Sequence, residues 1–217
     1  MGGIRIIVSK AVVLGCMLLS SISAGAQKFE FYDPDRIVKD SPKVNVQMRT
    51  NLLHDAIICP NIGFELQVGK GFAFDFDYGE AWWNSFSRNK FYSVIYFQGE
   101  VRKYIGKWSG KTPYRGHHIG VYMQMAAYDL ENGGRGYIAP ELDNTIGAGI
   151  SYGYSFRLSD RLSLDCTLGI GYMNSEYETY LPVGDMYVST GNNSRTWVGP
   201  TKIEASLVWN LFKKNRR

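Results

Sequence analysis

The chain has 217 residues, of which 45% are hydrophobic and 20% are charged, and its formal net charge is +4. This composition excludes a disordered chain and an acidic solvating tail. The excess of positive charge is small and scattered, so it gives no basic patch for binding nucleic acid. The length fits one domain of about 100–200 residues behind a leader.

Residues 1–26 have the pattern of a secretory signal peptide. Arg5 and Lys10 form its basic part, an apolar stretch follows, and Ala24-Gly25-Ala26 is a small-residue cleavage site. Cys16 lies in a loose lipoprotein cleavage box, which stays open as an alternative. After this leader no apolar run reaches about 18 residues, so no transmembrane helix is expected.

Residues 145–158 alternate between two kinds of side chain. Every second residue from Ile146 to Leu158 is apolar or aromatic, and the residues between them are small, polar or charged. A period of two is that of a β-strand, and a strand of about 14 residues suits a tilted membrane crossing. Similar stretches occur at residues 44–53, 61–69, 72–79, 91–105, 117–130, 162–172 and 200–212. No stretch has a clear period of 3.6 residues, so helices should be rare.

These stretches predict an all-β fold, a single up-and-down antiparallel transmembrane β-barrel of about eight strands, within residues 44–212. A polar segment, residues 27–43, precedes the barrel and a basic tail, residues 213–217, follows it. Long and short connections alternate, as outer loops and periplasmic turns do in outer-membrane barrels. The long ones are residues 80–90, 129–144 and 174–199, the short ones are 69–71 and 159–161, and 54–60 and 106–116 fit the alternation less well.

The polar positions of the predicted strands carry charged residues of both signs. These are Arg49, Glu65, Asp75, Asp77, Glu100, Arg102, Arg157, Asp165, Lys202 and Glu204. In a membrane barrel, an Arg or Lys turned towards lipid costs roughly 2–4 kcal/mol at mid-bilayer. The polar set is therefore predicted to face inward as a lumen charge network. Glycines such as Gly63 and Gly153 share these positions and would leave room for long neighbours.

No constellation of residues indicates an enzyme, a metal site or a cofactor. His117 and His118 are adjacent, so on a strand they point to opposite faces and cannot share a metal; we expect a solvated strand start there. No G-x-S-x-G nucleophile motif occurs. The paired carboxylates Asp75 and Asp77 fit the neutralisation of buried cations better than acid–base catalysis.

Several short motifs together are similar to a known family. They are Arg49-Thr50-Asn51-Leu52-Leu53, Pro60-Asn61-Ile62-Gly63, Ser151-Tyr152-Gly153-Tyr154, Gly169-Ile170-Gly171-Tyr172 and Gly199-Pro200-Thr201-Lys202. The chain resembles an uncharacterised family of Bacteroidetes outer-membrane proteins that carries a domain-of-unknown-function label. The resemblance implies a small outer-membrane barrel and, for some members, an association with surface-fimbria genes. It supplies no catalytic residues.

The expected function is that of a structural or surface-interaction barrel in the cell outer membrane. Its partners would be outer-membrane lipid and a surface or fimbrial protein that meets the extracellular loops, notably residues 174–199. We expect a monomer with no cofactor, no nucleic-acid partner and no enzymatic activity. The alternatives are a narrow pore and a lipocalin-like ligand-binding barrel, in which the apolar residues would face inward.

Overall fold

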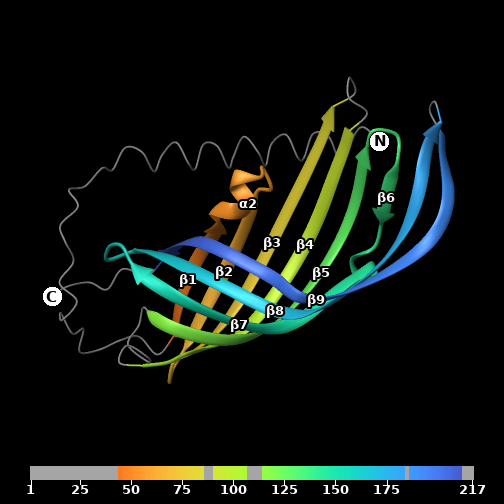
Figure 1. Cartoon of the computed structure of the whole chain (residues 1–217). Coiled ribbons are helices and arrows are strands. Elements are labelled where there is room, and N and C mark those ends of the chain that lie inside the picture. The colour runs from red at the N-terminus through yellow and green to blue at the C-terminus, as the bar shows by residue number, and fades with distance from the viewer. Residues whose placement is uncertain (1–43, 86–89, 107–113, 184–185, 212–217) are drawn as a thin grey trace. The chain divides into compact units, whose positions relative to one another are not determined.

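The computed structural model describes residues 44–85, 90–106, 114–183 and 186–211, all within one compact unit, residues 37–217. Most of these residues lie in β-strands (Figure 1). The strands are β1 (Val44–Asn51), β2 (Asn61–Val68), β3 (Phe72–Ser85), β4 (Lys90–Tyr104), β5 (Gly116–Asn132), β6 (Gly136–Ala139), β7 (Thr145–Arg157), β8 (Leu162–Val183) and β9 (Met186–Asn210). Two short helices are α2 (Leu52–Ala56) and the 3-10 helix η3 (Leu142–Asn144).

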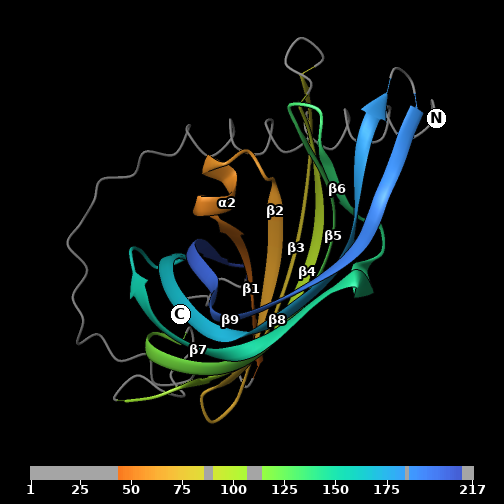
Figure 2. The same cartoon turned by 45° about the vertical axis from the view of Figure 1, so that its right-hand side comes forward.

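The antiparallel sheet closes on itself as a ring. Around the ring the strands follow the order β1-β2-β3-β4-β5-β7-β8-β9, and β9 pairs back onto β1 from Gln47↔Asn210 to Asn51↔Ser206. The short strand β6 pairs with β5 on one side and β8 on the other, beyond the end of the β5–β7 ladder (Figures 1 and 2). The predicted all-β antiparallel barrel is therefore confirmed, with β6 as an addition to it.

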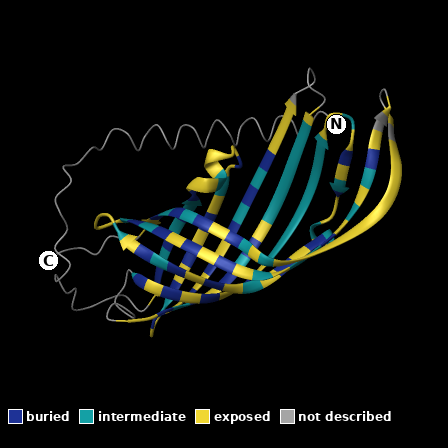
Figure 3. Cartoon of the chain, in the orientation of Figure 1, coloured by how far each residue is buried: buried dark blue, intermediate teal, exposed yellow. Residues whose placement is uncertain are grey.

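Burial alternates along the strands of the ring, which gives the checkered pattern of Figure 3. In β2, Glu65 and Gln67 are buried while Phe64 and Leu66 are exposed. The other strands of the ring repeat this arrangement, except that residues 91–96 of β4 and 124–131 of β5 are all half-buried. Where burial alternates, the inward face is polar and the outward face is apolar. This is the reverse of a water-soluble barrel, whose apolar side chains pack inside.

All three connections predicted as long loops consist largely of regular structure instead, and these predictions were wrong. In residues 129–144, β5 continues to Asn132, and β6 and η3 follow. In residues 80–90, β3 and β4 stay paired as far as Ser85↔Lys90. In residues 174–199, β8 and β9 form one long ribbon that ends at Val183↔Met186. The sequence there contains turn-forming residues such as Asn193, but Asn193 lies opposite Tyr177 within the ladder. Side-chain bonds across the ribbon, such as that from Thr190 Oγ1 to the Thr179 carbonyl at 2.9 Å, support the pairing.

Helix α2 begins in the last two residues of the predicted strand 44–53 and continues into the connection 54–60, so β1 ends earlier than predicted. The Asn51 side chain accepts a hydrogen bond from the Leu53 amide at 3.1 Å and so caps the helix. Thr50 Oγ1 donates to Asp55 at 2.8 Å and ties the helix to β1. A helix of one turn is too short to show a 3.6-residue period in the sequence. Among the described residues, no helix is long and apolar enough to cross a membrane.

At the opposite end of the ring, a tight turn joins β2 to β3. Lys70 and Gly71 both have positive φ, 61° and 81°, as the centre of a type I′ hairpin turn requires. The turn predicted at residues 69–71 is thus confirmed. The predicted signal peptide, the polar segment 27–43, the basic tail and residues 107–113 of the 106–116 connection lie outside the described residues.

Candidate functional site: a buried charge network

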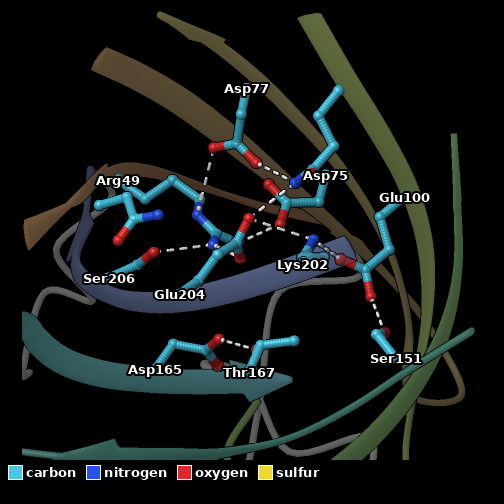
Figure 4. A network of polar contacts seen from close by, with 12 residues as sticks. Arg49, Asp75, Asp77, Glu100, Ser151, Asp165, Thr167, Lys202, Glu204 and Ser206 are labelled. Atoms are coloured by element: carbon cyan, nitrogen blue, oxygen red, sulfur yellow. Dashed lines mark hydrogen bonds and ion pairs between the residues drawn. The ribbon is translucent and has the colours of Figure 1, made fainter. Parts of the chain in front are cut away.

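Charged side chains meet inside the ring (Figure 4). We call the following set the interior network: Arg49 on β1, Glu65 on β2, Asp75 and Asp77 on β3, Glu100 and Arg102 on β4, Asp165 on β8, and Lys202 and Glu204 on β9. None of these residues is more than 9% exposed. Alternation of side chains along each strand turns all of them inward. Strands from both ends of the chain therefore contribute to one cluster.

Arg49 contacts carboxyl groups on two other strands. It forms an ion pair with Asp75, and its Nε lies 3.4 Å from Asp77 Oδ1. Its Nη2 donates to Glu204 Oε2 at 2.6 Å and to Ser206 Oγ at 2.8 Å. A guanidinium buried this completely is stable only when its charge is paired in this way.

A glycine makes room for Arg49. In the sheet register Gly63 lies directly opposite Arg49 on β1 and directly opposite Asp77 on β3. A Cβ at residue 63 would meet the Asp77 carboxylate and would lie 2.7 Å from Arg49 Cγ. The missing side chain on β2 therefore lets the flanking charges approach each other across the strand.

Arg102 is a second centre of the network. Its Nη2 lies 2.7 Å from Asp75 Oδ2 and donates to Glu100 Oε2 at 2.9 Å. Its Nη1 donates to Glu65 Oε2 at 3.2 Å and lies 3.7 Å from Asp165 Oδ1. Since Asp75 also pairs with Arg49, the two guanidinium groups share a carboxylate and the charges form one connected system.

Lys202 joins the network from β9. Its Nζ donates to Glu100 Oε2 at 2.5 Å and lies 3.2 Å from Glu204 Oε1. Glu204 also accepts a hydrogen bond from Gln98 Nε2 at 2.7 Å. The last strand of the chain is thus bound to β4 by charged side chains, although β9 and β4 are not neighbours in the sheet.

Several uncharged partners of the network were not predicted from the sequence. Ser151 donates to Glu100 and Tyr104 donates to Glu65. His118, expected to be solvated, is instead fully buried, and its Nε2 donates to Asp165 at 3.0 Å. Its inward position follows from the same alternation that orients the charges, but a polar residue near a strand end gives no signal of burial.

Arg157 was predicted to belong to the network, and the structure places it elsewhere. It is the last residue of β7, and its Nη2 donates to Asp160 at 3.0 Å in the turn that follows. Its Nε donates to the Ser159 carbonyl at 2.9 Å. A side chain so close to the strand end can bend back to the turn, so alternation alone does not fix its contacts.

Aromatic rings fill the inside of the ring next to the network, at the end where β2 turns into β3. Tyr104 packs between Tyr114 and His118, with ring centroids 5.4 Å and 5.1 Å away. The Tyr114 amide donates to Gln67 Oε1 at 3.0 Å. All four side chains are buried, so this end of the interior is filled by packed side chains.

Helix α2 lies at the opposite end of the interior, which we call the α2 end. His54 Nδ1 is 2.6 Å from the Tyr96 hydroxyl on β4, and the two rings pack edge to face. Burial lowers the pKa of His54, although the nearby Glu204 acts in the opposite direction. Burial also raises the pKa of Asp55, a shift that its hydrogen bond from Thr50 reduces. The neutral form of His54 is therefore favoured when α2 is in place.

One comparison with known proteins gives a family. A family model described as "Protein of unknown function (DUF3575)" matches residues 12–211. The chain belongs to this family. No curated protein matches the chain, and no solved structure does.

In this DUF3575 chain the buried charges have the arrangement of a structural network. Its three cations, Arg49, Arg102 and Lys202, each contact more than one carboxyl group. The network holds six carboxyl groups and three cations, so each cation is shared between several carboxyl groups. Within the described residues, no cluster of His, Cys, Asp and Glu could hold a metal ion.

Proposed function

We propose that this DUF3575 protein is a small outer-membrane β-barrel that acts as a structural or surface-interaction protein. The interior network would hold its strands together, and the α2 end would face the cell exterior and meet a surface partner. We also propose that the protein belongs to a Bacteroidetes outer-membrane family, some members of which are associated with surface-fimbria genes. Lipid would surround the outward face of the ring.

The main support for this proposal is the apolar outward face of the ring. Val121, Ile150 and Ile170 lie side by side on β5, β7 and β8, and they are 64%, 66% and 63% exposed. Large exposed apolar residues also follow the outward positions of the other strands of the ring. An apolar surface of this extent around a closed ring is unfavourable in water and suits the hydrocarbon of a bilayer.

The two alternative functions receive less support. A lipocalin-like barrel would need apolar residues inside, where this protein has charged ones. A narrow pore would need an open path, whereas the interior network and the Tyr104–Tyr114 cluster occupy the inside of the ring. We therefore expect planar bilayers that contain the purified protein to show no stable conductance steps.

The mobility of the unboiled and boiled outer-membrane fraction on a denaturing gel tests the proposal directly. A closed barrel resists detergent until it is heated, so we expect the unboiled protein to migrate differently from the boiled protein. Recovery of the protein in the soluble periplasmic fraction, with no heat-dependent shift, would overturn the proposal.

A further inference from the structure

Among the described residues, the ribbon of β8 and β9 lacks a neighbouring strand on its β9 side at the α2 end. Strand β9 pairs with β1 only as far as Asn51↔Ser206, while it pairs with β8 up to Val183↔Met186. The ribbon therefore extends beyond the ring, as Figures 1 and 2 show. Along this extension the described residues place a strand on the β8 side of β9 and none on its other side.

The ladder register identifies the main-chain groups at this edge. The carbonyl of the even-numbered Leu162 accepts a hydrogen bond from Leu158, on the β7 side, whereas the carbonyl of the odd-numbered Arg161 accepts one from Asn210 at the end of β9. Odd-numbered residues of β8 therefore direct their main-chain amides and carbonyls towards β9. Opposite the odd residues Ser175 and Met173 lie Arg195 and Trp197. The intervening residues of β9 therefore turn their amides and carbonyls to the open edge; they are Asn192, Ser194, Thr196 and Val198.

This edge has a regular central part with irregular ends. The β8–β9 register shifts once near Thr190 and once near Thr201. Pro200, which has no amide hydrogen, lies beside the second shift. Proline and bulges are common ways to block the edge of a sheet. Between these two points, residues 192–198 contain neither.

The edge of β3 is open in the same way. The Glu80 amide donates to the Pro60 carbonyl at 3.0 Å, at the point where β2 begins. The amides of Trp82 and Asn84 point in the same direction by alternation, but β2 does not reach them. Among the described residues, β3 and β9 thus both have an unpaired edge beyond the ends of the shorter strands β2 and β1.

We propose that residues 192–198 bind an extended segment of another protein, which adds to the edge of β9 as a further strand. A row of unpaired amides and carbonyls at β-strand spacing is matched by another extended main chain. The inference rests on the proposed function, which places the α2 end outside the cell, and it names the kind of partner that this end takes.

The side chains next to this edge indicate the chemistry of the partner segment. Arg195 and Trp197 lie on the face that continues the inside of the ring. Opposite charges and apolar contacts stabilise pairs on neighbouring strands. The segment should therefore place an acidic residue opposite Arg195 and an apolar or aromatic one beside Trp197.

A second copy of this chain fits the edge less well. If two copies paired antiparallel through all four open residues, Ser194 would face Thr196, and Asn192 would face Val198. Arg195 would then lie directly opposite Arg195 of the other copy. Like charges in that position destabilise a strand pair, so the edge favours a different, acidic segment.

The first test measures amide hydrogen exchange by NMR on protein in detergent micelles that has passed the heat-shift test. In the free protein, we expect the Ser194 and Thr196 amides to exchange faster than those of Arg195 and Trp197. The probe is a synthetic peptide that copies residues 173–181, MNSEYETYL, because this acidic and aromatic sequence already pairs with β9 on its other edge. On its addition, exchange at Ser194 and Thr196 should slow.

A proline variant tests whether the main chain carries the binding. Thr196→Pro removes one edge amide and leaves the ladder with β8 intact, whereas Thr196→Ala removes the same side chain and keeps the amide. We expect the peptide to bind Thr196→Pro about tenfold more weakly than Thr196→Ala, the effect of losing roughly one hydrogen bond. A peptide with both glutamates changed to lysine should also bind more weakly.

Other results would overturn the inference. If the proline and alanine variants bind equally, or if the peptide protects no alternate amides, the edge takes no strand. If Ser194 and Thr196 are already protected, the edge is covered: a dimer in sedimentation would assign it to a second copy, and loss of protection on deletion of residues 27–43 would assign it to the chain's own segment. Each sample should also show the heat-dependent gel shift that tests the proposed function. A sample that shows this shift but fails the binding or exchange tests contradicts the strand-edge inference alone.

Discussion

Glu204 links more strands than any single backbone pairing does. Its carboxylate contacts Arg49 on β1, Gln98 and Arg102 on β4, and Lys202 on its own strand. Buried charges stabilise a fold only when all of them are paired, and removal of one partner leaves the others uncompensated. The contribution of Glu204 is therefore best measured against an apolar neighbour on the same strand.

We predict that Glu204→Leu destabilises the barrel strongly, while Ile203→Leu does not. The first change leaves Arg49 and Lys202 each short of one buried partner and should cost ~3–5 kcal/mol. Ile203 points outward and is 61% exposed, so its change keeps an apolar surface. The measurement is thermal unfolding in detergent, followed by the gel shift. Equal melting of both variants would contradict a stabilising role for the interior network.

We also predict that Gly63→Ala destabilises the barrel and that Gly69→Ala does not. A Cβ at residue 63 would collide with Arg49 and Asp77, whereas one at residue 69 has nothing within 4 Å. Overpacking of this kind costs about 1–3 kcal/mol. The same melting assay compares the two variants, and a stability of Gly63→Ala equal to that of Gly69→Ala would show that the charges move apart without cost.

At the scale of elements, α2 lies at one end of the ring and is attached there by side-chain hydrogen bonds, among them those that Asp55 accepts from Thr50 and Asn61. Trp83 Nε1 donates to the Ile58 carbonyl at 3.0 Å, just after the helix, and His54 bonds to Tyr96. The exposed side chains around it include Leu52 and Ile57. Because α2 is one turn long and has no buried residue, it should detach from the ring at a lower free energy than the strands do.

We predict that acidification weakens the docking of α2. Because the pKa of docked His54 is lowered by burial, the undocked helix binds more protons below about pH 6.5, the usual histidine value. Docking should therefore be fully stable above this value and lose stability as pH falls towards the lowered pKa. Asp55 contributes with the opposite sign, because burial raises its pKa from the ordinary value of 3.8.

Amide exchange of residues 52–58 at pH 7.5 and 5.5, corrected for the intrinsic pH dependence, measures this effect. Protection should be lower at pH 5.5 in the native protein. His54→Phe, which cannot titrate, serves as the control and should show the same protection at both pH values. Identical protection of the native segment at the two values would rule out His54 as the cause.

The sequence predicted those parts of the structure that depend on alternation. Glu65 and Asp75 lie in strands with strict two-residue patterns, so their inward position could be read directly. Arg157 could not be placed in this way because the chain turns after it. The outer ribbon of β8 and β9 was missed because it has no buried face for most of its length, and alternation reports only burial.

At the scale of the whole molecule, the apolar residues around the ring give different expectations for a protein in water and for one in lipid. Ile150 on β7 lies within the apolar row with Val121 and Ile170, whereas Val188 lies in the ribbon beyond the ring. Both side chains are exposed, at 66% and 49%. In a soluble protein both side chains would face water, whereas in a membrane protein only Ile150 would face lipid.

We predict that Ile150→Arg impairs assembly in the outer membrane and that Val188→Arg is tolerated. An arginine facing lipid at mid-bilayer costs roughly 2–4 kcal/mol, and one near or beyond the interface about 0–1 kcal/mol. The amount of heat-shifted protein in the membrane fraction is the measurement. Equal amounts of both variants would mean that the row around Ile150 does not contact lipid.

The position of Lys202 and Glu204 on β9 has a consequence for biogenesis. During synthesis these two residues emerge last, after Arg49 and Arg102 have been made, so an incomplete sheet holds cations whose final partner is absent. Closure of the β1–β9 seam therefore also completes the ion pairs of Arg49 and Arg102 with Glu204. A chain shortened before β9 would lack the seam and these ion pairs together, so the two defects could not be separated by truncation.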